Sequence, residues 1–269
     1  SVGIVIPMIG TEFYERLIKS MEKKLRQQWY TPILFPLLKS EWLSKITKFD
    51  IPATDVEGII FCSMDIEKLY MPGKIPTERA VVLVDSYSPL YDSVFIDNIY
   101  GGYIAGKKLS TYDGDIFVIM MNETIDTAYS PVFHSRLKGF RTALREKNII
   151  LPDENIQIFD YSWSAGSLAA KNIFSKSSPP YNIFAMTDLY AFGVIKEAQN
   201  EGLEVGNDVR IIGYDDQSIA QDWSITTVKQ PIEKMGEYGI NFLLERLKGF
   251  NDKPRKIQLK PELITRNTA

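Results

Sequence analysis

Two carboxylates follow a short apolar run in the last third of the chain. The run from Val209 to Gly213 has no turn residue before its glycine, and Tyr214 then leads to Asp215 and Asp216. A buried parallel strand ends in this way at a ligand crevice. Asp215 could accept hydrogen bonds from ligand hydroxyls or cap the next turn, and two adjacent acidic residues favour the ligand role. Asp216 is then expected to have a structural role.

Arg136 stands at the start of a predicted helix, where a positive charge opposes the helix dipole. A functional reason for this arginine is therefore favoured. Its planar fork of donors suits paired vicinal hydroxyls or a carboxylate. The alternative is a salt bridge to Asp160 or Asp188. Arg136 and Asp215 together predict a site for a hydroxyl-rich ligand.

Further candidates stand where predicted strands end or helices begin. Capping of the next helix and ligand contact are both open for Thr187 and Asp188. Aromatic rings can cover the C–H face of a sugar ring, although core packing is their commoner use. We expect one of two second-half aromatics to stack on the ligand, and the choice between them is open. The remaining candidates are Phe13 and Tyr14 in the first helix, Tyr161 and Trp163 between a strand and a helix, and Cys62, Ser63 and Tyr100.

Apolar periodicity predicts alternating strands and helices along the whole chain. Strands are expected at residues 2–7, 31–35, 56–61, 80–84, 93–96, 116–121, 156–159, 183–186, 209–214, 225–231, 255–259 and 263–266. Helices are expected over residues 13–26 with Thr11 as N-cap, from Ser40 to about Asp50, after Asp97 and Asn98, around Arg136, and over residues 164–174, 189–201 and 233–248. This alternation predicts an α/β fold built by repeated βαβ winding.

Bulk composition excludes several classes of protein. The chain has 269 residues, of which 45% are apolar and 24% charged, as in ordinary globular proteins. Its formal net charge of −3 does not favour direct binding of these residues to nucleic acid. One cysteine, Cys62, permits no internal disulfide, and one histidine, His134, leaves no Cys/His cluster for zinc. No apolar run approaches the ~20 residues of a membrane span, and the first residues do not resemble a signal peptide.

The sequence has no recognisable set of residues that would activate a catalytic nucleophile. His134 is the only histidine, and no glycine-flanked serine motif accompanies it. No glycine-rich phosphate loop with a following lysine is present either. We therefore predict a binding protein without enzymatic activity, cofactor or metal, and we expect His134 to lie on the surface at a helix start.

Six motifs in register resemble the effector-binding core of regulators of the lactose/galactose repressor (LacI/GalR) family. They are Val5-Ile6-Pro7 followed by Phe13-Tyr14; Asp97-Asn98 with Gly101 and Ala105; Arg136 to Phe140; Thr187-Asp188 with Ala191 and Gly193; Ile212 to Asp216 with Ile225 to Pro231; and Leu263 to Arg266. The resemblance covers essentially the whole chain. Each motif alone is weak, but their shared order makes the resemblance specific.

The resemblance implies the type I periplasmic-binding-protein fold, with two similar parallel-sheet lobes flanked by helices and a ligand cleft between them. Residues 1–111 and 231–249 would form the N-terminal lobe, and residues 112–230 and 250–269 the C-terminal lobe. Crossovers would then lie near Thr111, Gln230 and Phe250. In this family the arginine at the position of Arg136 contacts the effector. The family usually has asparagine where Thr187 stands, which puts the same contact pattern in doubt.

The same resemblance implies a bacterial, cytoplasmic transcription repressor that senses a sugar or sugar derivative. It further implies a homodimer and an N-terminal helix-turn-helix domain for operator DNA that these residues do not include. A sugar receptor of a membrane transport system is the alternative, because the fold is shared. The absence of a signal peptide, and the segments at 226–231 and 263–266, favour the regulator. A third possibility, response to a protein corepressor, is supported by no particular residue.

Overall fold

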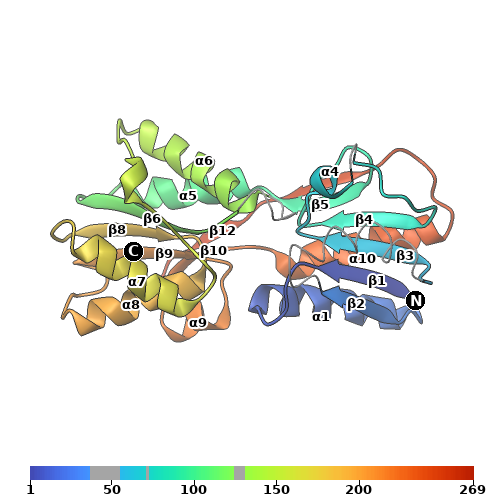
Figure 1. Cartoon of the computed structure of the whole chain (residues 1–269), viewed down its shortest axis with the longest axis horizontal. Helices are drawn as coiled ribbons and strands as arrows, with labels where there is room; N and C mark the ends of the chain where they lie inside the picture. Colours follow the sequence, from blue (N-terminus) through green and yellow to red (C-terminus); the bar gives the residue numbers. More distant parts are fainter. Residues whose placement is uncertain (37–54, 71–72, 124–130) are drawn as a thin grey trace. The chain divides into compact units, whose positions relative to one another are not determined.

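The computed structural model describes residues 1–36, 55–70, 73–123 and 131–269 (Figure 1). These residues form two compact units. The first unit holds described residues of Ser1–Ile96 and Pro231–Leu259. The second holds Asp97–Glu123, Val132–Gln230 and Lys260–Ala269. The helix expected from Ser40 to about Asp50 lies outside the described residues.

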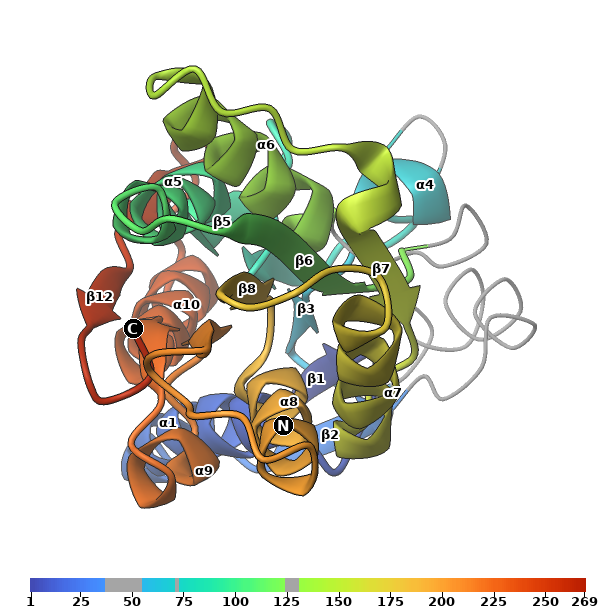
Figure 2. The ribbon, with the colours of Figure 1, turned by 90° about the vertical axis from the view of Figure 1, so that its left-hand side faces the viewer.

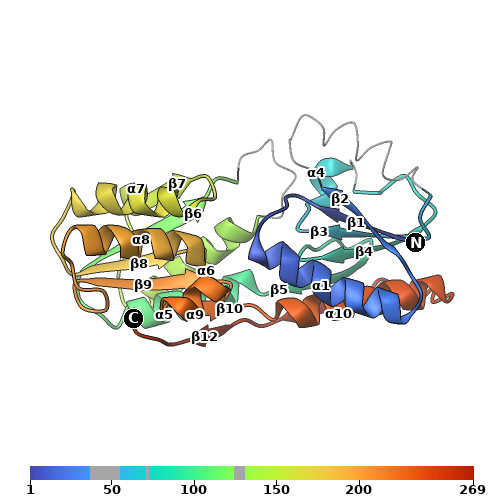
Figure 3. The same ribbon diagram turned by 90° about the horizontal axis from the view of Figure 1, so that it is seen from below.

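The first unit is built on a six-stranded sheet in the order β11-β5-β4-β3-β1-β2. Its strands are β1 (Val2–Ile6), β2 (Pro32–Pro36), β3 (Gly58–Cys62), β4 (Ala80–Val84), β5 (Asp92–Ile96) and β11 (Lys256–Leu259), and all of their pairings are parallel. β1 and β3 are buried at every residue, as interior parallel strands should be. Helices α1 (Glu12–Gln27) and α10 (Ile232–Leu247) pack against each other in this unit (Figure 3), and α4 is the short helix Ile66–Leu69.

The second unit has a six-stranded sheet in the order β12-β10-β9-β8-β6-β7. Its strands are β6 (Asp115–Met121), β7 (Ile156–Phe159), β8 (Tyr181–Ala185), β9 (Val209–Tyr214), β10 (Thr226–Lys229) and β12 (Glu262–Ile264). The pairings are parallel except that of β12 with β10, so the predicted parallel sheet has an antiparallel edge strand. This arrangement and that of the first unit confirm the predicted α/β fold with two parallel-dominated sheets.

Helices cover both faces of the second sheet (Figure 2). On one face lie α5 (Asn98–Leu109) and α6 (Val132–Arg145), and on the other lie α7 (Trp163–Phe174) and α8 (Asp188–Asn200). Side chains of alternate residues in β6 point to opposite faces of the sheet. Val118 and Met120 pack with α5 and α6, whereas Phe117 and Ile119 pack with α7 and α8. The short helix α9 (Ser218–Asp222) and the 3-10 turn η2 (Asp153–Asn155) complete the unit and were not predicted.

Helix caps follow the polar residues that the sequence places ahead of each helix. The side chain of Thr11 accepts a hydrogen bond from the backbone of Tyr14, which confirms it as the N-cap of α1. Asp97 accepts in the same way from the Tyr100 amide at the start of α5. Ser162 caps α7 with its hydroxyl. These local hydrogen bonds explain why the predicted helix starts agree closely with the observed ones.

The compact units divide the chain at residues 96/97, 230/231 and 259/260. Helix α5 belongs to the second unit because it packs tightly on α6, where a Cβ on Gly102 would lie 1.8 Å from the carbonyl oxygen of Arg136. Strand β11 belongs to the first unit because it pairs with β5. The crossovers that the resemblance implies near Thr111, Gln230 and Phe250, and the lobes they would join, stay a prediction.

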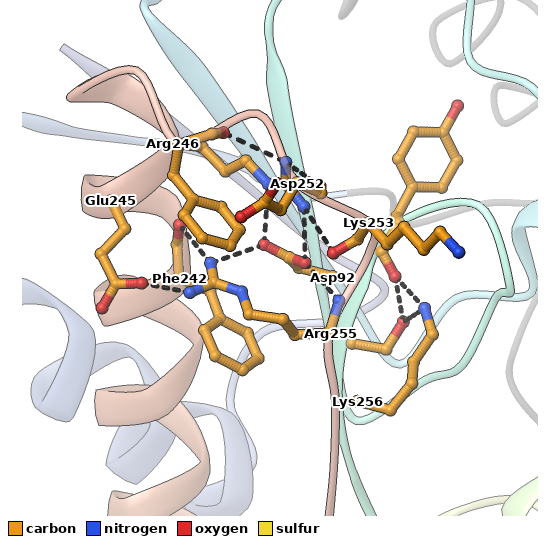
Figure 4. A network of polar contacts seen from close by, with 11 residues as sticks. Asp92, Phe242, Glu245, Arg246, Asp252, Lys253, Arg255 and Lys256 are labelled. Atoms are coloured by element: carbon orange, nitrogen blue, oxygen red, sulfur yellow. Dashed lines mark hydrogen bonds and ion pairs between the residues drawn. The ribbon is translucent and has the colours of Figure 1, made fainter.

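A polar network ties β11 into the first unit (Figure 4). The carboxylate of Asp92, which has no exposed side-chain surface, accepts hydrogen bonds from Arg246 of α10 and from both the backbone and the side chain of Arg255. Arg255 also lies over the rings of Phe242 and Phe250, each at 4.1 Å from the centroid. The network joins distant parts of the sequence, since Asp92 and Arg246 are 154 residues apart.

Candidate functional site

Polar side chains meet at the carboxyl ends of neighbouring strands in the second unit. Thr187 follows β8, Asp215 follows β9, and Gln230 follows β10, and these strands are adjacent in the sheet. All three residues are buried. Because parallel strands direct their carboxyl ends to one edge of the sheet, this edge gathers polar groups that are far apart in the sequence.

Arg136 reaches this edge from α6 and is 5% exposed. Its Nε donates to Asn98 Oδ1 at 3.0 Å, and its Nη1 donates to the carbonyl oxygen of Met186 at 3.0 Å. The guanidinium carbon lies 3.6 Å from the centroid of the Tyr214 ring and 5.0 Å from that of Phe133. Neutral acceptors and aromatic faces thus hold the arginine in one orientation.

Asp215 lies beside Arg136 in the strained left-handed region, with φ of 102°. Its Oδ1 accepts a hydrogen bond from Gln230 Nε2 at 2.6 Å, and its Oδ2 accepts one from Gln217 Nε2 at 3.3 Å. Arg136 Nη2 lies 4.0 Å from Asp215 Oδ1, which is an ion-pair distance and too long for a direct hydrogen bond. We refer to Arg136, Asn98, Tyr214, Asp215 and Gln230 as the Arg136 cluster.

Asp188 supports this cluster from within the unit and is fully buried. Its two carboxyl oxygens accept from the Thr227 hydroxyl at 2.6 Å and from the Gln217 backbone amide at 2.8 Å. Burial, and then the nearby Asp215 carboxylate, raise the pKa of Asp188 well above its ordinary value, although these two hydrogen bonds act in the opposite direction. In the structure Asp188 therefore positions Gln217 and Thr227.

Asp216 has the structural role that the sequence favoured. Its Oδ1 accepts a hydrogen bond from Arg266 Nη2 at 2.7 Å, and its Oδ2 lies 4.0 Å from Lys229 Nζ. The hydrogen bond ties the end of β9 to the C-terminal segment, and the ion pair links it to β10. The ion pair of Arg136 is with Asp215 and not with either of the two carboxylates, Asp160 and Asp188, considered from the sequence.

The structure separates the two second-unit aromatic candidates. The hydroxyl of Tyr161 accepts a hydrogen bond at 3.3 Å from Gln217 Nε2, the same group that contacts Asp215. Tyr161 is therefore linked to the Arg136 cluster through Gln217. Trp163 is 51% exposed instead, and its ring packs against Phe192 with centroids 6.2 Å apart. Thr187 caps α8 by accepting from the Tyr190 amide at 3.2 Å.

The first-unit candidates lie at the corresponding strand ends of their own sheet. Ser63 follows β3 with φ of 54°, and its hydroxyl donates to Asp85 Oδ2 at 2.6 Å. Cys62 is fully buried, and burial followed by the Asp85 carboxylate raises the pKa of its thiol. Phe13 and Tyr14 open α1 with their rings at 90° and 5.0 Å between centroids, and Tyr14 is buried.

Tyr100 and His134 lie on the outer surface of the second unit. Tyr100 is 37% exposed and stacks on Tyr103 along α5, with Lys260 5.3 Å from its ring centroid. None of these contacts joins it to the Arg136 cluster. His134 lies exposed in the first turn of α6, as expected, and its Nδ1 is 2.5 Å from Glu123 Oε2.

Sequence reasoning missed several residues that build the cluster. The sequence placed Asn98 only at a helix start and within a family motif, whereas in the structure Asp97 caps α5 and Asn98 accepts a hydrogen bond from Arg136. Gln217 and Gln230 were not considered as site residues. The available signal was their position, because Gln217 closely follows Asp215 and Gln230 lies near the end of a predicted strand. Among the residues that the structure describes, no group of three or more metal-binding side chains is close enough to hold an ion.

Comparison with known proteins identifies the family. Residues 117–269, more than half of the chain, match the family described as periplasmic binding protein-like domain. The HTH-type transcriptional repressor PurR of Vibrio campbellii is 26% identical over 281 residues, which cover 100% of this chain and 81% of the relative.

Solved structures agree with this assignment. A probable transcription regulator from Thermus thermophilus is 36% identical with a TM-score of 0.87, and the match covers 100% of this chain and 97% of the other. A LacI family transcriptional regulator from Enterococcus faecium with bound ribose has a TM-score of 0.81 at 23% identity, over 100% and 98% of the two chains. At that identity the second likeness concerns the fold. None of the described helices has both the length and the apolar character needed to cross a membrane. The chain thus belongs to the periplasmic binding protein-like domain family, as the effector-binding core of a regulator of the lactose/galactose repressor type.

Proposed function

We propose that the Arg136 cluster binds a polyhydroxylated effector, namely a sugar or a sugar derivative. The observation that carries this proposal is the placement of a buried guanidinium 4.0 Å from the Asp215 carboxylate at the carboxyl ends of β8, β9 and β10. A hydroxyl near both groups could accept from Arg136 and donate to Asp215 in the same position. Vicinal hydroxyls would extend the same pattern over two adjacent carbons.

Neighbouring groups support a hydroxyl-rich ligand. Gln230 is 1% exposed, and its Oε1 has no hydrogen-bond partner among the described residues, so it could accept from a further hydroxyl. Tyr161 would supply the aromatic face for the ring of the ligand, because it shares Gln217 with Asp215. Asp188 would act indirectly by holding Gln217 and Thr227. Thr187, Phe13, Tyr14, Cys62, Ser63, Trp163 and Tyr100 are retained as weaker proposals for ligand contact.

In the full-length regulator, we propose, effector binding changes the affinity for operator DNA. The similar proteins named above are transcription regulators, which favours this role over that of a transport receptor. The same similarity supports a binding role without catalysis for this chain. An effector can change operator binding only to the extent that its affinity differs between the two conformations of the regulator. Effector affinity must therefore be measured before any effect on DNA binding.

Isothermal titration calorimetry against a panel of pentoses, hexoses, disaccharides, nucleosides and organic acids tests the proposal. We expect one of the sugar classes to bind. Asp215→Ala and Arg136→Ala should each weaken that binding roughly tenfold to hundredfold, because each removes a charge-assisted hydrogen bond of ~1.5–3 kcal/mol. Asp153→Ala, which removes a largely exposed carboxylate, is the matched control. Unchanged affinity in both cluster variants would end the assignment of the site.

A homodimer is the second part of the proposal. An aromatic row of Trp163, Phe192 and Trp223 lies across α7, α8 and the end of α9, with Phe192 and Trp223 centroids 5.0 Å apart. The two tryptophans are 51% and 37% exposed, which is unusual for such large apolar rings. A second copy of the chain is the occupant we propose, because repressors that read two half-sites need two heads.

Light scattering at micromolar concentration tests the dimer. Trp223→Glu should shift the assembly toward monomer because it places a charge within an apolar contact. Ile150→Glu, at a side chain that is 85% exposed on another part of the unit, is the control and should leave the mass unchanged. A wild-type protein that is strictly monomeric would contradict the dimer without affecting the effector site.

A further inference from the structure

The outer face of α6 carries a stripe of basic side chains that the effector site does not use. His134, Lys138, Arg141 and Arg145 follow one another at intervals of four, three and four residues. At 100° per residue these positions share one side of the helix, opposite Arg136. The helix contains no aspartate or glutamate over its whole length. Glu123 contacts His134 at one end of the stripe, and Lys138, Arg141 and Arg145 make the rest of this face positively charged in a chain with a formal charge of −3.

Two depressions lie along this stripe. One, of about 260 Å³, is lined by His134, Leu137, Lys138, Arg141 and Arg145. The other, of about 180 Å³, is lined by Arg141, Arg145, Ile149, Ile150, Leu151 and Asp153. They share Arg141 and Arg145 and so form one continuous surface, which we call the basic groove. Its lining includes apolar side chains, of which Ile150 is 85% exposed.

Helix stability alone does not explain the cations. A positive charge in the last turn interacts favourably with the helix dipole, which accounts for Arg145. Lys138 lies outside that turn and is exposed. Within the described residues, neither the Lys138 ammonium nor the Arg145 guanidinium has an ion-pair partner. Arg141 pairs with Asp153, whose side chain is 90% exposed, so an incoming carboxylate could displace this pair at little cost.

We propose that the basic groove docks an acidic peptide segment of a partner protein. The stripe from His134 to Arg145 spans about 16 Å, which is the length of roughly five extended residues and exceeds that of a single phosphate ion. Cations spaced along the groove would pair with successive carboxylates, and Leu137, Ile149 and Ile150 would receive apolar side chains between them. This inference concerns the opposite face of α6 from Arg136 and does not depend on the identity of the effector.

Fluorescence anisotropy with a labelled peptide of glutamate and leucine tests the groove in the intact chain. We expect binding that weakens as salt is added, because exposed charges carry it. Lys138→Glu with Arg145→Glu should weaken binding about tenfold or more. Lys19→Glu with Lys23→Glu, an equal charge change on the exposed side of α1, is the matched control and should have little effect. Lys138→Gln with Arg145→Gln gives a milder variant if the double reversal fails to fold.

Three outcomes would overturn the proposal. The first is peptide binding that is absent at low salt or insensitive to the Lys138 and Arg145 changes. The second is competition by inorganic phosphate at concentrations comparable to those of the peptide, which would indicate a small-anion site. The third is preferential binding of a duplex DNA oligonucleotide with the same dependence on Lys138 and Arg145, which would assign the groove to nucleic acid.

Discussion

The two units each place buried carboxylates beside arginine, but they do so in contrasting ways. In the first unit, Asp92 accepts direct hydrogen bonds from Arg246 and Arg255 at 2.6–2.9 Å. In the second, Arg136 and Asp215 are 4.0 Å apart, and amides of glutamine side chains contact the carboxylate. Direct charge-assisted bonds fix the positions of both partners more strongly than an ion pair at 4.0 Å does. The first arrangement suits stability, and the second is the one that we propose for ligand binding.

The pKa shifts of buried aspartates show the same contrast. Burial alone would raise the pKa of Asp92, but hydrogen bonds from Arg246 and Arg255 outweigh it and lower the pKa to about 2. Burial raises the pKa of Asp188, and the adjacent carboxylates of Asp215 and Asp216 raise it further. The first unit therefore gains from an ionised aspartate, while the second unit tolerates a group of acidic residues at its strand ends.

The largest expected effect is the loss of stability in Asp92→Ala. Removing this carboxylate leaves two partly buried arginines without their shared partner, and breaking a buried pair of this kind costs about 3–5 kcal/mol. Urea denaturation measures the loss, and hydrogen exchange should locate it at β5 and β11. Effector affinity should stay close to that of the wild type. A loss below about 1 kcal/mol would show that the network is not the stabilising element of the first unit.

Asp215→Asn should have the opposite effects, with a loss of effector affinity and little change in stability. We expect effector affinity to fall roughly tenfold to hundredfold, because a charge-assisted acceptor is lost. The free energy of unfolding should change by less than about 1 kcal/mol, since the asparagine keeps a similar shape and tolerates positive φ. Calorimetry and denaturation on the same preparation give both values. Equal effects on stability and binding would remove the distinction between the two units.

Acid should act on the first unit through Asp92. Its pKa is lower in the folded protein than its ordinary value of 3.8, so the stability it contributes is present above pH 4. That contribution is lost as the pH falls from 3.8 toward about 2. Denaturation between pH 5 and pH 2 should show this decline, and Asp92→Asn should flatten it. A decline of the same size in Asp92→Asn would assign acid sensitivity to other carboxylates.

Titration of Asp188 should change stability with pH in the opposite direction to that of Asp92, and by the smallest amount of these predictions. Its pKa is raised on folding, so the folded protein binds this proton more tightly than the unfolded chain. Stability should therefore be greatest below the ordinary pKa and should decrease as the pH rises through the raised pKa. Asp188→Asn removes this titration and should flatten the decrease. Carbon-13 NMR of Asp188 in Asp215→Asn sharpens the test, because loss of the neighbouring charge should lower its pKa.

Local sequence determined much of the fold before any contact was known. Periodicity located β4, β7 and β9 at the observed residues and most other elements to within a few positions. Polar residues ahead of apolar periodic runs identified caps such as Thr11. The short strand that ends just before Asp215 likewise indicated an edge of the sheet where polar groups gather. These features depend on interactions over a few residues, so the order of residues is sufficient to predict them.

Tertiary structure alone decided which distant segments became partners. The helix after Asp97 joined the second unit because its glycines allow close packing on α6, and periodicity contains no information about that contact. The pairing of Arg136 with Asn98 spans 38 residues, and that of Asp92 with Arg255 spans 163. Side-chain type made these pairs possible, but the sheet order brought them together. The contrast between Asp92, which is hydrogen-bonded to two arginines, and Asp215, which lies 4.0 Å from one, therefore exists only in the folded chain. It depends on distances that no local sequence pattern encodes.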